Sequence, residues 1–370
     1  MSLRTLYFIG HCLSLDDHPS FRETIIVQFS DPDYDWNTFI FTCSNHLVLP
    51  VIYLKFRKHN LLSYLPEVLV QHLEEIYSLN RDRNLQIIEQ MKEITVTLNS
   101  AGISPLFMKG TGNLIDGVYS DVGERIIGDI DLLVPEKDFL TAAGLFEKEG
   151  YQICYPVDEN TKSVKHYPRL WKENEVADLE IHRLPTDLKH ATNFTAEVVL
   201  KTKKSVAGYP GCYVLADEHK VILNFIHSQL ANAGHILGIV SLRDIYDLYC
   251  FSKRVKLQNI TKTAPFRQKM IAYLKISEKL LMLPDSFYAG ETIGSRAYQL
   301  KHDLNSTSVL ISTANRLNWV ISLSFGFVIR QIRDIFTNPA FRRKNILNLL
   351  SPAFIWNKFR LSLKLAKGSK

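Results

Sequence analysis

The sequence has little of what marks several specialised classes of protein. Its five cysteines are odd in number and widely spaced, at positions 12, 43, 154, 212 and 250. This spacing argues against a thiolate zinc site, a CxxC redox pair and a disulfide framework, and it favours buried free thiols in a reducing compartment. Internal repeats and low-complexity linkers are also missing, and Gly110 and Gly112 lack the third glycine of a dinucleotide-binding loop.

Long apolar runs are absent as well. The longest covers residues 317–329 and contains an asparagine and two serines, so it is too short and too polar to span a bilayer alone. Near the start of the chain, Arg4 and the polar residues 14–20 interrupt any apolar segment, and we expect no signal peptide. We therefore predict a cytoplasmic protein without a transmembrane segment.

The composition is that of a folded protein, with 370 residues, 46% of them hydrophobic and 22% charged. The net charge of +6 is unevenly distributed, because residues 316–370 hold 11 Lys/Arg and one acid, whereas the preceding 315 residues hold 33 basic and 37 acidic groups. Aromatic and aliphatic residues alternate with these C-terminal cations. The segment is therefore either a packed helical subdomain with a basic face or an amphipathic contact for an anionic membrane surface or acidic partner.

Apolar spacing divides the chain into helical and mixed regions. Apolar residues recur every three or four positions from Pro66 to just before Gly102, which predicts one long amphipathic helix or two helices in line. The polar segment 80–84 interrupts this pattern. Strands are predicted at 103–108, 126–134 and 151–155, a helix at 135–150, and a hairpin from 164–171 and 176–182.

After Pro185 the chain is predicted to be helical again, with helices near 217–234 and 239–251. The fold class is therefore α+β, with a small mixed sheet between helical flanks. We predict four regions: an N-terminal helical region (1–100), a catalytic core (101–185), a helical domain packed on the core (186–315) and a basic amphipathic tail (316–370).

The most informative segment is the strand that contains Asp129 and Asp131. Residues i and i+2 of a strand point to the same face, so these two carboxylates lie side by side while Ile130 and Leu132 face a core. Carboxylates this close repel one another unless a cation lies between them. Oxygen ligands of this kind suit Mg²⁺ or Mn²⁺ held together with substrate phosphates.

A second acidic strand follows, with Asp178, Glu180 and His182 on one face. If it pairs beside the first strand, a third carboxylate completes a site of the kind that binds two metal ions and aligns a hydroxyl with a nucleotide α-phosphate. Either Glu180 or Asp178 can be this third acid, depending on the register of the two strands.

These residues, in this order, carry a family resemblance. Lys109-Gly110, Arg125, Asp129-Ile130-Asp131, His166 and Glu180-Ile181-His182 resemble the pattern LKG … R … DIDLLV … H … VELH. That pattern belongs to the bacterial family of uncharacterised nucleotidyltransferases, within the polymerase-β-type nucleotidyltransferase superfamily. Residues 241–248 (SLRDIYDL) are similar to the family's helical LRDLYDL segment, and the resemblance spans residues 60–250.

The resemblance implies a polymerase-β-like core in which Asp129, Asp131 and Glu180 are metal ligands. Glu180 would also draw the proton from the acceptor. The wider superfamily has Gly-Ser where this chain has Lys109-Gly110, followed by Thr111. We expect the lysine to act as a point charge on the triphosphate, the glycine to permit close backbone approach, and the threonine to supply the hydroxyl.

Other polar residues have a structural alternative beside a functional one. Arg125 is placed for a phosphate contact, or for an ion pair with Glu124 or Asp121. His182 either orients Glu180 or contacts substrate, or it is a structural residue at the strand end. His166 either takes a direct part in the site or is structural. A last set is interpreted as an ion-pair cluster that ties its helix to the core, with a contact from the arginine to the nucleotide as the alternative: Arg243, Asp244 and Asp247.

The resulting hypothesis is a magnesium- or manganese-dependent nucleotidyltransferase. It would transfer an NMP from an NTP such as ATP to a hydroxyl acceptor, a glycan, peptide, protein or RNA, and release pyrophosphate. The alternatives are a non-catalytic scaffold with this fold, or a peripheral membrane adaptor that acts through residues 316–370. The expected location is the cytoplasm, with the inner membrane face as an alternative if the tail binds lipid.

Overall fold

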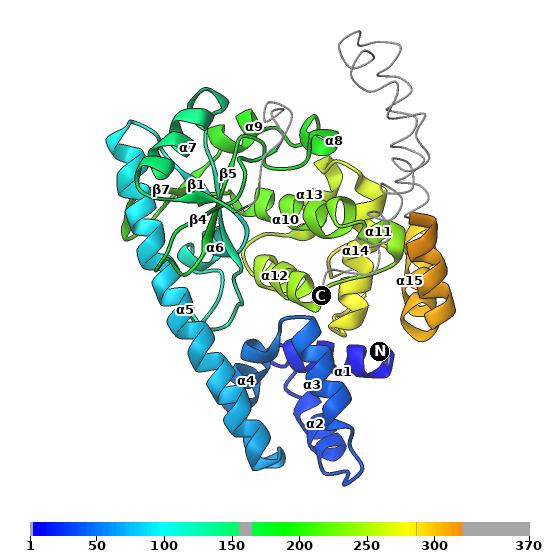
Figure 1. The fold of residues 1–370 in the computed structure, drawn as a ribbon. Coiled ribbons are helices and arrows are strands. Elements are labelled where there is room, and N and C mark those ends of the chain that lie inside the picture. The colour runs from blue at the N-terminus through cyan, green and yellow to red at the C-terminus, as the bar shows by residue number, and fades with distance from the viewer. Residues whose placement is uncertain (1–2, 155–164, 286, 320–370) are drawn as a thin grey trace, which may run out of the picture.

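A computed structural model describes residues 3–154, 165–285 and 287–319 of the chain (Figure 1). The predicted tail at 316–370 lies almost wholly outside these residues. The helices are α1 (Leu3–Leu13), α2 (Phe21–Phe29), α3 (Trp36–Asn45), α4 (Leu49–Lys58), α5 (Glu67–Ser100), α6 (Lys109–Ile115), α7 (Phe139–Lys148), α8 (Leu188–Ala191), α9 (Ala196–Lys201), α10 (Asp217–Phe225), α11 (Gly234–Leu237), α12 (Leu242–Ser252), α13 (Leu257–Thr263), α14 (Arg267–Leu280) and α15 (Ile293–Thr307).

The strands of the described residues form one seven-stranded mixed sheet in the order β3-β4-β5-β2-β1-β7-β6. Their bounds are β1 (Leu106–Phe107), β2 (Asp129–Leu133), β3 (Gln152–Ile153), β4 (Leu170–Trp171), β5 (Asp178–His182), β6 (Lys204–Val206) and β7 (Tyr209–Val214). At the centre, β2 runs parallel to β5 and antiparallel to β1. The predicted α+β class, with a mixed sheet between helical flanks, is confirmed.

One expectation about the fold is wrong. The chain does not become wholly helical after Pro185, because β6 and β7 form a hairpin and β7 pairs in parallel with β1. β6 has only three residues, and β7 contains Pro210 and Gly211, so neither shows the alternation that reveals a strand. The sheet therefore extends beyond the predicted core of residues 101–185.

Helix α5 is one continuous helix of 34 residues and runs along one side of the molecule from the N-terminal helices to the sheet (Figure 1). Its polar interruption at 80–84 has a structural purpose. The buried amides of Asn80 and Asn84 donate to the carbonyls of the segment before β2, including Arg125 O at 3.2 and 2.8 Å. Arg83 donates to the carbonyls of Gly128 and Val176 at 3.1 Å each, and so fixes the starts of β2 and β5.

Within the described residues, one cluster of buried apolar side chains runs from α1 through the sheet to α15. The N-terminal helices α1–α4 lie below the sheet, and α10–α14 lie beside it (Figure 1). No single helix in the described part of the chain is long and apolar enough to cross a membrane, although α3 and α4 together pass that test with a bend of 120°.

Candidate functional site

The acids of the two central strands meet in register. Asp131 on β2 is paired with Glu180 on β5, and Asp129 with Asp178. The two acidic strands, β2 and β5, therefore pair side by side, which the sequence alone could not establish. Alternation places Ile130, Leu132 and Leu179 in the core and the acids on the opposite face.

Asp131 is the most deeply buried of these acids. Its Oδ1 accepts hydrogen bonds from Lys109 Nζ at 2.6 Å and from His182 Nε2 at 2.8 Å. Burial alone would raise the pKa of Asp131, but Lys109 and His182 hold it well below its ordinary value. In return, Asp131 raises the pKa of Lys109 against the effect of burial. The carboxylate is therefore ionised and the lysine charged at neutral pH.

Glu180 and His182 complete a compact donor set with Asp131. His182 Nε2 lies 3.4 Å from Glu180 Oε2, and one ligand atom from each of the three residues lies within 4.8 Å of the others. Burial would raise the pKa of Glu180, but hydrogen bonds from His182 and Arg169 lower it to about 2. Two ionised carboxylates and an imidazole, all buried, fit a divalent cation.

Asp129 and Asp178 lie at the edge of this set rather than within it. Burial and the neighbouring Asp131 raise the pKa of Asp129. The side chain of Asp178 is 42% exposed, whereas that of Glu180 is 10% exposed. Of the two alternatives for a third acid, Glu180 is thus the one that contacts the cluster.

Arg169 is a residue of this site that the sequence analysis missed. Its Nη2 donates to Asp129 Oδ2 at 2.8 Å and to Glu180 Oε1 at 2.6 Å, and its Nη1 lies 3.7 Å from Asp178 Oδ2. It precedes β4, which pairs with β5 on the side away from β2. The only sequence signal was a basic residue opposite an acidic strand in the predicted hairpin.

A cavity of about 280 Å³ adjoins the two acids of β2. It opens between the β1–α6 connection and helices α10 and α12. Its walls combine cationic, amide and apolar side chains, including Lys109, Asn113, Lys220, His227, Arg243 and Phe251. Burial lowers the pKa of His227 to about 4, so this imidazole is neutral at neutral pH. The cavity thus offers positive charge and apolar surface next to the acidic cluster.

Of the predicted nucleotide-binding residues, two line the cavity in the first turn of α6 and the next one is buried. Lys109 and Gly110 line the cavity, and Lys109 has a left-handed backbone with φ of 48°, uncommon for a residue with a side chain. Thr111 is fully buried, and its hydroxyl donates to the backbone carbonyl of Asp129 at 3.3 Å. The structure therefore gives Thr111 a contact that supports β2, and not the phosphate-facing position that we expected.

Arg125 also lines the cavity, and its ion pair is with a residue that we did not predict. The partner is Asp247 on α12, not Glu124 or Asp121, with Nε–Oδ1 and Nη2–Oδ2 distances of 2.9 Å. Asp247 thereby ties α12 to the core, as expected. Arg243 forms the expected ion pair with Asp244, with Nε 3.5 Å from Oδ1, and it also lines the cavity. Its Nε has no hydrogen-bond partner among the described residues.

The two remaining candidates are the histidines. His182 is fully buried in the cluster, and its Nδ1 has no hydrogen-bond partner within the described ranges. His166 forms an isolated β-bridge with His182, and the ring centroids are 5.1 Å apart. His166 Nδ1 lies 2.7 Å from the carbonyl oxygen of Tyr167. His166 is therefore a neighbour of the cluster through His182.

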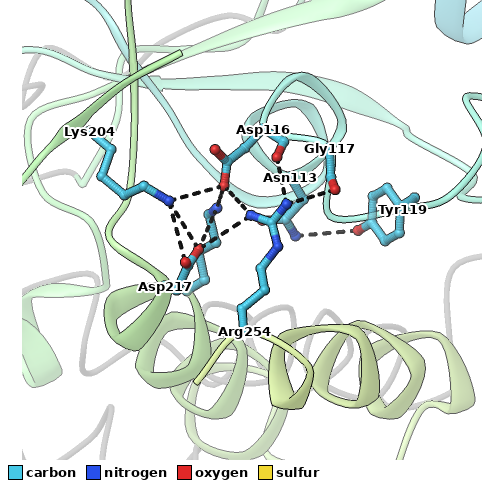
Figure 2. A network of polar contacts seen from close by, with 8 residues as sticks. Asn113, Asp116, Gly117, Tyr119, Lys204, Asp217 and Arg254 are labelled. Carbon is cyan, nitrogen blue, oxygen red and sulfur yellow. Dashed lines mark hydrogen bonds and ion pairs between the residues drawn. The ribbon is translucent and has the colours of Figure 1, made fainter. Parts of the chain in front are cut away.

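Lys220, which lines the cavity, belongs to a network of ion pairs with Asp116 and Asp217. Figure 2 shows these two acids with Lys204 and Arg254. Lys220 of α10 bonds to Asp116, which follows α6, and lies 3.1 Å from Asp217. Arg254 Nη1 lies 2.6 Å from Asp116 Oδ2, and Lys204 reaches both acids. These pairs join α6, α10, β6 and the segment after α12, so the cavity has a wall held by several elements.

A mixed sheet that presents ionised acids beside a cationic cavity is suited to the chemistry of phosphate esters. Residues 32–267 match the model of the family described as uncharacterised nucleotidyltransferase. The match covers more than half of the chain, and the protein therefore belongs to this family. No curated protein matches the chain.

Proposed function

We propose that the protein is a divalent-metal-dependent nucleotidyltransferase. It transfers an NMP from an NTP to a hydroxyl of an acceptor and releases pyrophosphate. The observation that carries the proposal is the meeting of Asp131, Glu180 and His182 at one end of a cavity whose wall carries Lys109 and Arg243.

The cavity is where we place the nucleotide. Its cations can pair with a triphosphate, and the Nε of Arg243, which is 3.5 Å from Asp244, makes no hydrogen bond within the described part of the chain. Arg125 also lines the cavity, but its charge is paired with Asp247, so it supports the wall. Phe251 and the neutral His227 offer less polar surface for the remainder of the nucleotide.

The acids act at the end of the cavity where Asp131 lies. Asp131 and Glu180, with His182 and with Asp129 nearby, would hold Mg²⁺ or Mn²⁺, and the imidazole nitrogen favours Mn²⁺ of the two. The bound ion would neutralise the charge that develops on the α-phosphate and activate the acceptor hydroxyl. Glu180 is ionised at neutral pH and can accept the proton of the acceptor hydroxyl. The hydroxyl oxygen then bonds to the α-phosphorus, and pyrophosphate departs.

Parallel assays with NTP labelled in the α- or the γ-phosphate test the proposal. Purified protein is incubated with each NTP, Mn²⁺ and separate extracts of glycan, peptide, protein and RNA. Nucleotidyl transfer places the α-label on an acceptor fraction and leaves the γ-label in pyrophosphate. Transfer of the γ-label to the acceptor would instead show a kinase, and α-label transfer that survives in Asp131→Asn would contradict the assigned site.

A further inference from the structure

The acidic cluster contains a charged partner that belongs to the chain itself. Asp129 is bound to Arg169, at 2.8 Å, and is absent from the compact set formed by Asp131, Glu180 and His182. Yet Asp129 lies two residues from Asp131 on the same face of β2, with 28% of its side chain exposed. Its carboxylate is therefore close to the set but turned toward the guanidinium.

We propose that Arg169 withholds Asp129 from the metal site, so that Asp129 exchanges the guanidinium for a divalent cation when the site is loaded. The inference rests on the proposed function. It makes Arg169 a positioning residue that sets the affinity for the metal ion. The two cations, guanidinium and metal, compete for the same carboxylates.

Charge balance supports such an exchange. The carboxylates of Asp129, Asp131 and Glu180 carry three negative charges, and Lys109 and Arg169 supply two positive charges at hydrogen-bond distance. A divalent ion added to this group would face a guanidinium on the same carboxylates, and two cations at such distances repel strongly where burial limits screening. The more exposed of the two side chains, Arg169 at 36% against 22% for Lys109, is the one with room to move.

The two oxygens of Glu180 show how the exchange can occur without dismantling the site. Arg169 uses Oε1 of Glu180, whereas His182 lies against Oε2. Glu180 can therefore present Oε2 to a metal ion as the guanidinium on the Oε1 side moves away. Asp129 accepts from the same Nη2 of Arg169 and lies outside the compact set, so it is the acid that must turn from the guanidinium to reach a metal ion.

The test is Mn²⁺ titration of the full chain without nucleotide, read from the electron paramagnetic resonance signal of free Mn²⁺. Arg169→Gln should bind Mn²⁺ at least about tenfold more tightly than wild type, because both the competitor and its charge are removed. Arg169→Lys, which keeps the charge without the fork of donors, should fall between them. Lys172→Gln removes one charge from the same hairpin outside the cluster and should change the affinity by less than about twofold.

A double-mutant cycle tests the role of Asp129. In an Asp129→Asn background, the gain in affinity from Arg169→Gln should shrink, because the withheld ligand is gone. An Arg169→Gln protein that is folded but binds Mn²⁺ no more tightly than wild type would overturn the inference and leave the proposed function standing. If neither wild type nor Arg169→Gln shows Mn²⁺ binding that is lost on Asp131→Asn substitution, the proposed function fails as well.

Discussion

At the scale of single residues, the site is a set of acids kept ionised by their neighbours. Asp131 and Glu180 are buried, yet each has a pKa below its ordinary value because Lys109, His182 or Arg169 donates to it. A buried carboxylate without such partners would take up a proton. Asp131 and Glu180 are thus the ionised carboxylates that the described structure brings together with His182.

Glu180 and Asp178 offer a matched pair for testing this assignment. They lie two residues apart on β5, and the side chain of Glu180 is 10% exposed against 42% for Asp178. We predict that Glu180→Gln lowers kcat of nucleotidyl transfer by at least about 100-fold, because it removes charge that acts on the reacting groups. Asp178→Asn should lower kcat by less than about tenfold, since Asp178 lies outside the cluster. Equal losses in the two variants would mean that the third acid is wrongly assigned.

At the scale of elements, the site depends on how closely α6 approaches β1. Gly112 lies on α6 where a Cβ atom would come within 2.4 Å of the backbone carbonyl oxygen of Phe107. At Gly110, the corresponding atom would meet only the side chain of Ile127, at 3.2 Å. Gly112 is therefore the glycine that permits α6 to approach the backbone of β1. Lys109, at the start of the same helix, lies 2.6 Å from Asp131.

Alanine substitutions at these two glycines test this difference in packing. Gly112→Ala should destabilise the protein by about 1–3 kcal/mol, because neither the strand nor the helix can move freely. Gly110→Ala should cost less than about 1 kcal/mol, because a side chain can adjust. Thermal unfolding of the two variants measures the difference. A Gly112→Ala protein as stable as wild type would show that α6 is less tightly seated than described.

At the scale of the whole molecule, the N-terminal helices are joined to the rest through both packing and charge. Ser14, which follows α1, donates to the carbonyl of Leu281 at 2.8 Å, and α1 packs on α14. Next to it, Asp16 is bound by Lys55 at 2.7 Å, by His59 at 2.8 Å and by Lys58 at 3.1 Å, all three from α4 or its end. These contacts hold α4 to the segment after α1.

The Asp16 cluster predicts a pH dependence of stability. Burial opposes ionisation, but hydrogen bonds from Lys55 and His59 hold the pKa of Asp16 below its ordinary value. A lowered folded-state pKa contributes stability that is fully present above the unfolded pKa, about 3.9, and lost as the pH falls below it. Asp16→Asn should therefore melt below wild type at pH 7 and at pH 5, with a smaller deficit at pH 3. A deficit that is the same at all three pH values would show that Asp16 acts by packing alone.

The sequence could predict the parts of this molecule that follow from strong local patterns. The period of two placed Asp129 and Asp131 on one face, and the spacing of three and four predicted α5, although not that it is unbroken. Arg169, the partner of Arg125 and the buried contacts of Asn84 could not be predicted, because each depends on which strand or helix lies opposite. The β6–β7 hairpin was missed because β6 has only three residues and β7 contains Pro210. The pairing of β7 with β1 is a long-range contact.

The central claim is that a divalent cation and an NTP bind together at the acids of β2 and β5. The most direct measurement is the melting temperature with each of the four NTPs, with Mg²⁺, Mn²⁺ or EDTA, for wild type, Asp131→Asn and the matched control Asp178→Asn. A ligand at about 100 times its Kd adds about 2.7 kcal/mol, which is a rise of several degrees. We predict a metal-dependent rise with at least one NTP in wild type and Asp178→Asn that is lost in Asp131→Asn. No rise with any NTP, or a rise that persists in EDTA, would contradict the account.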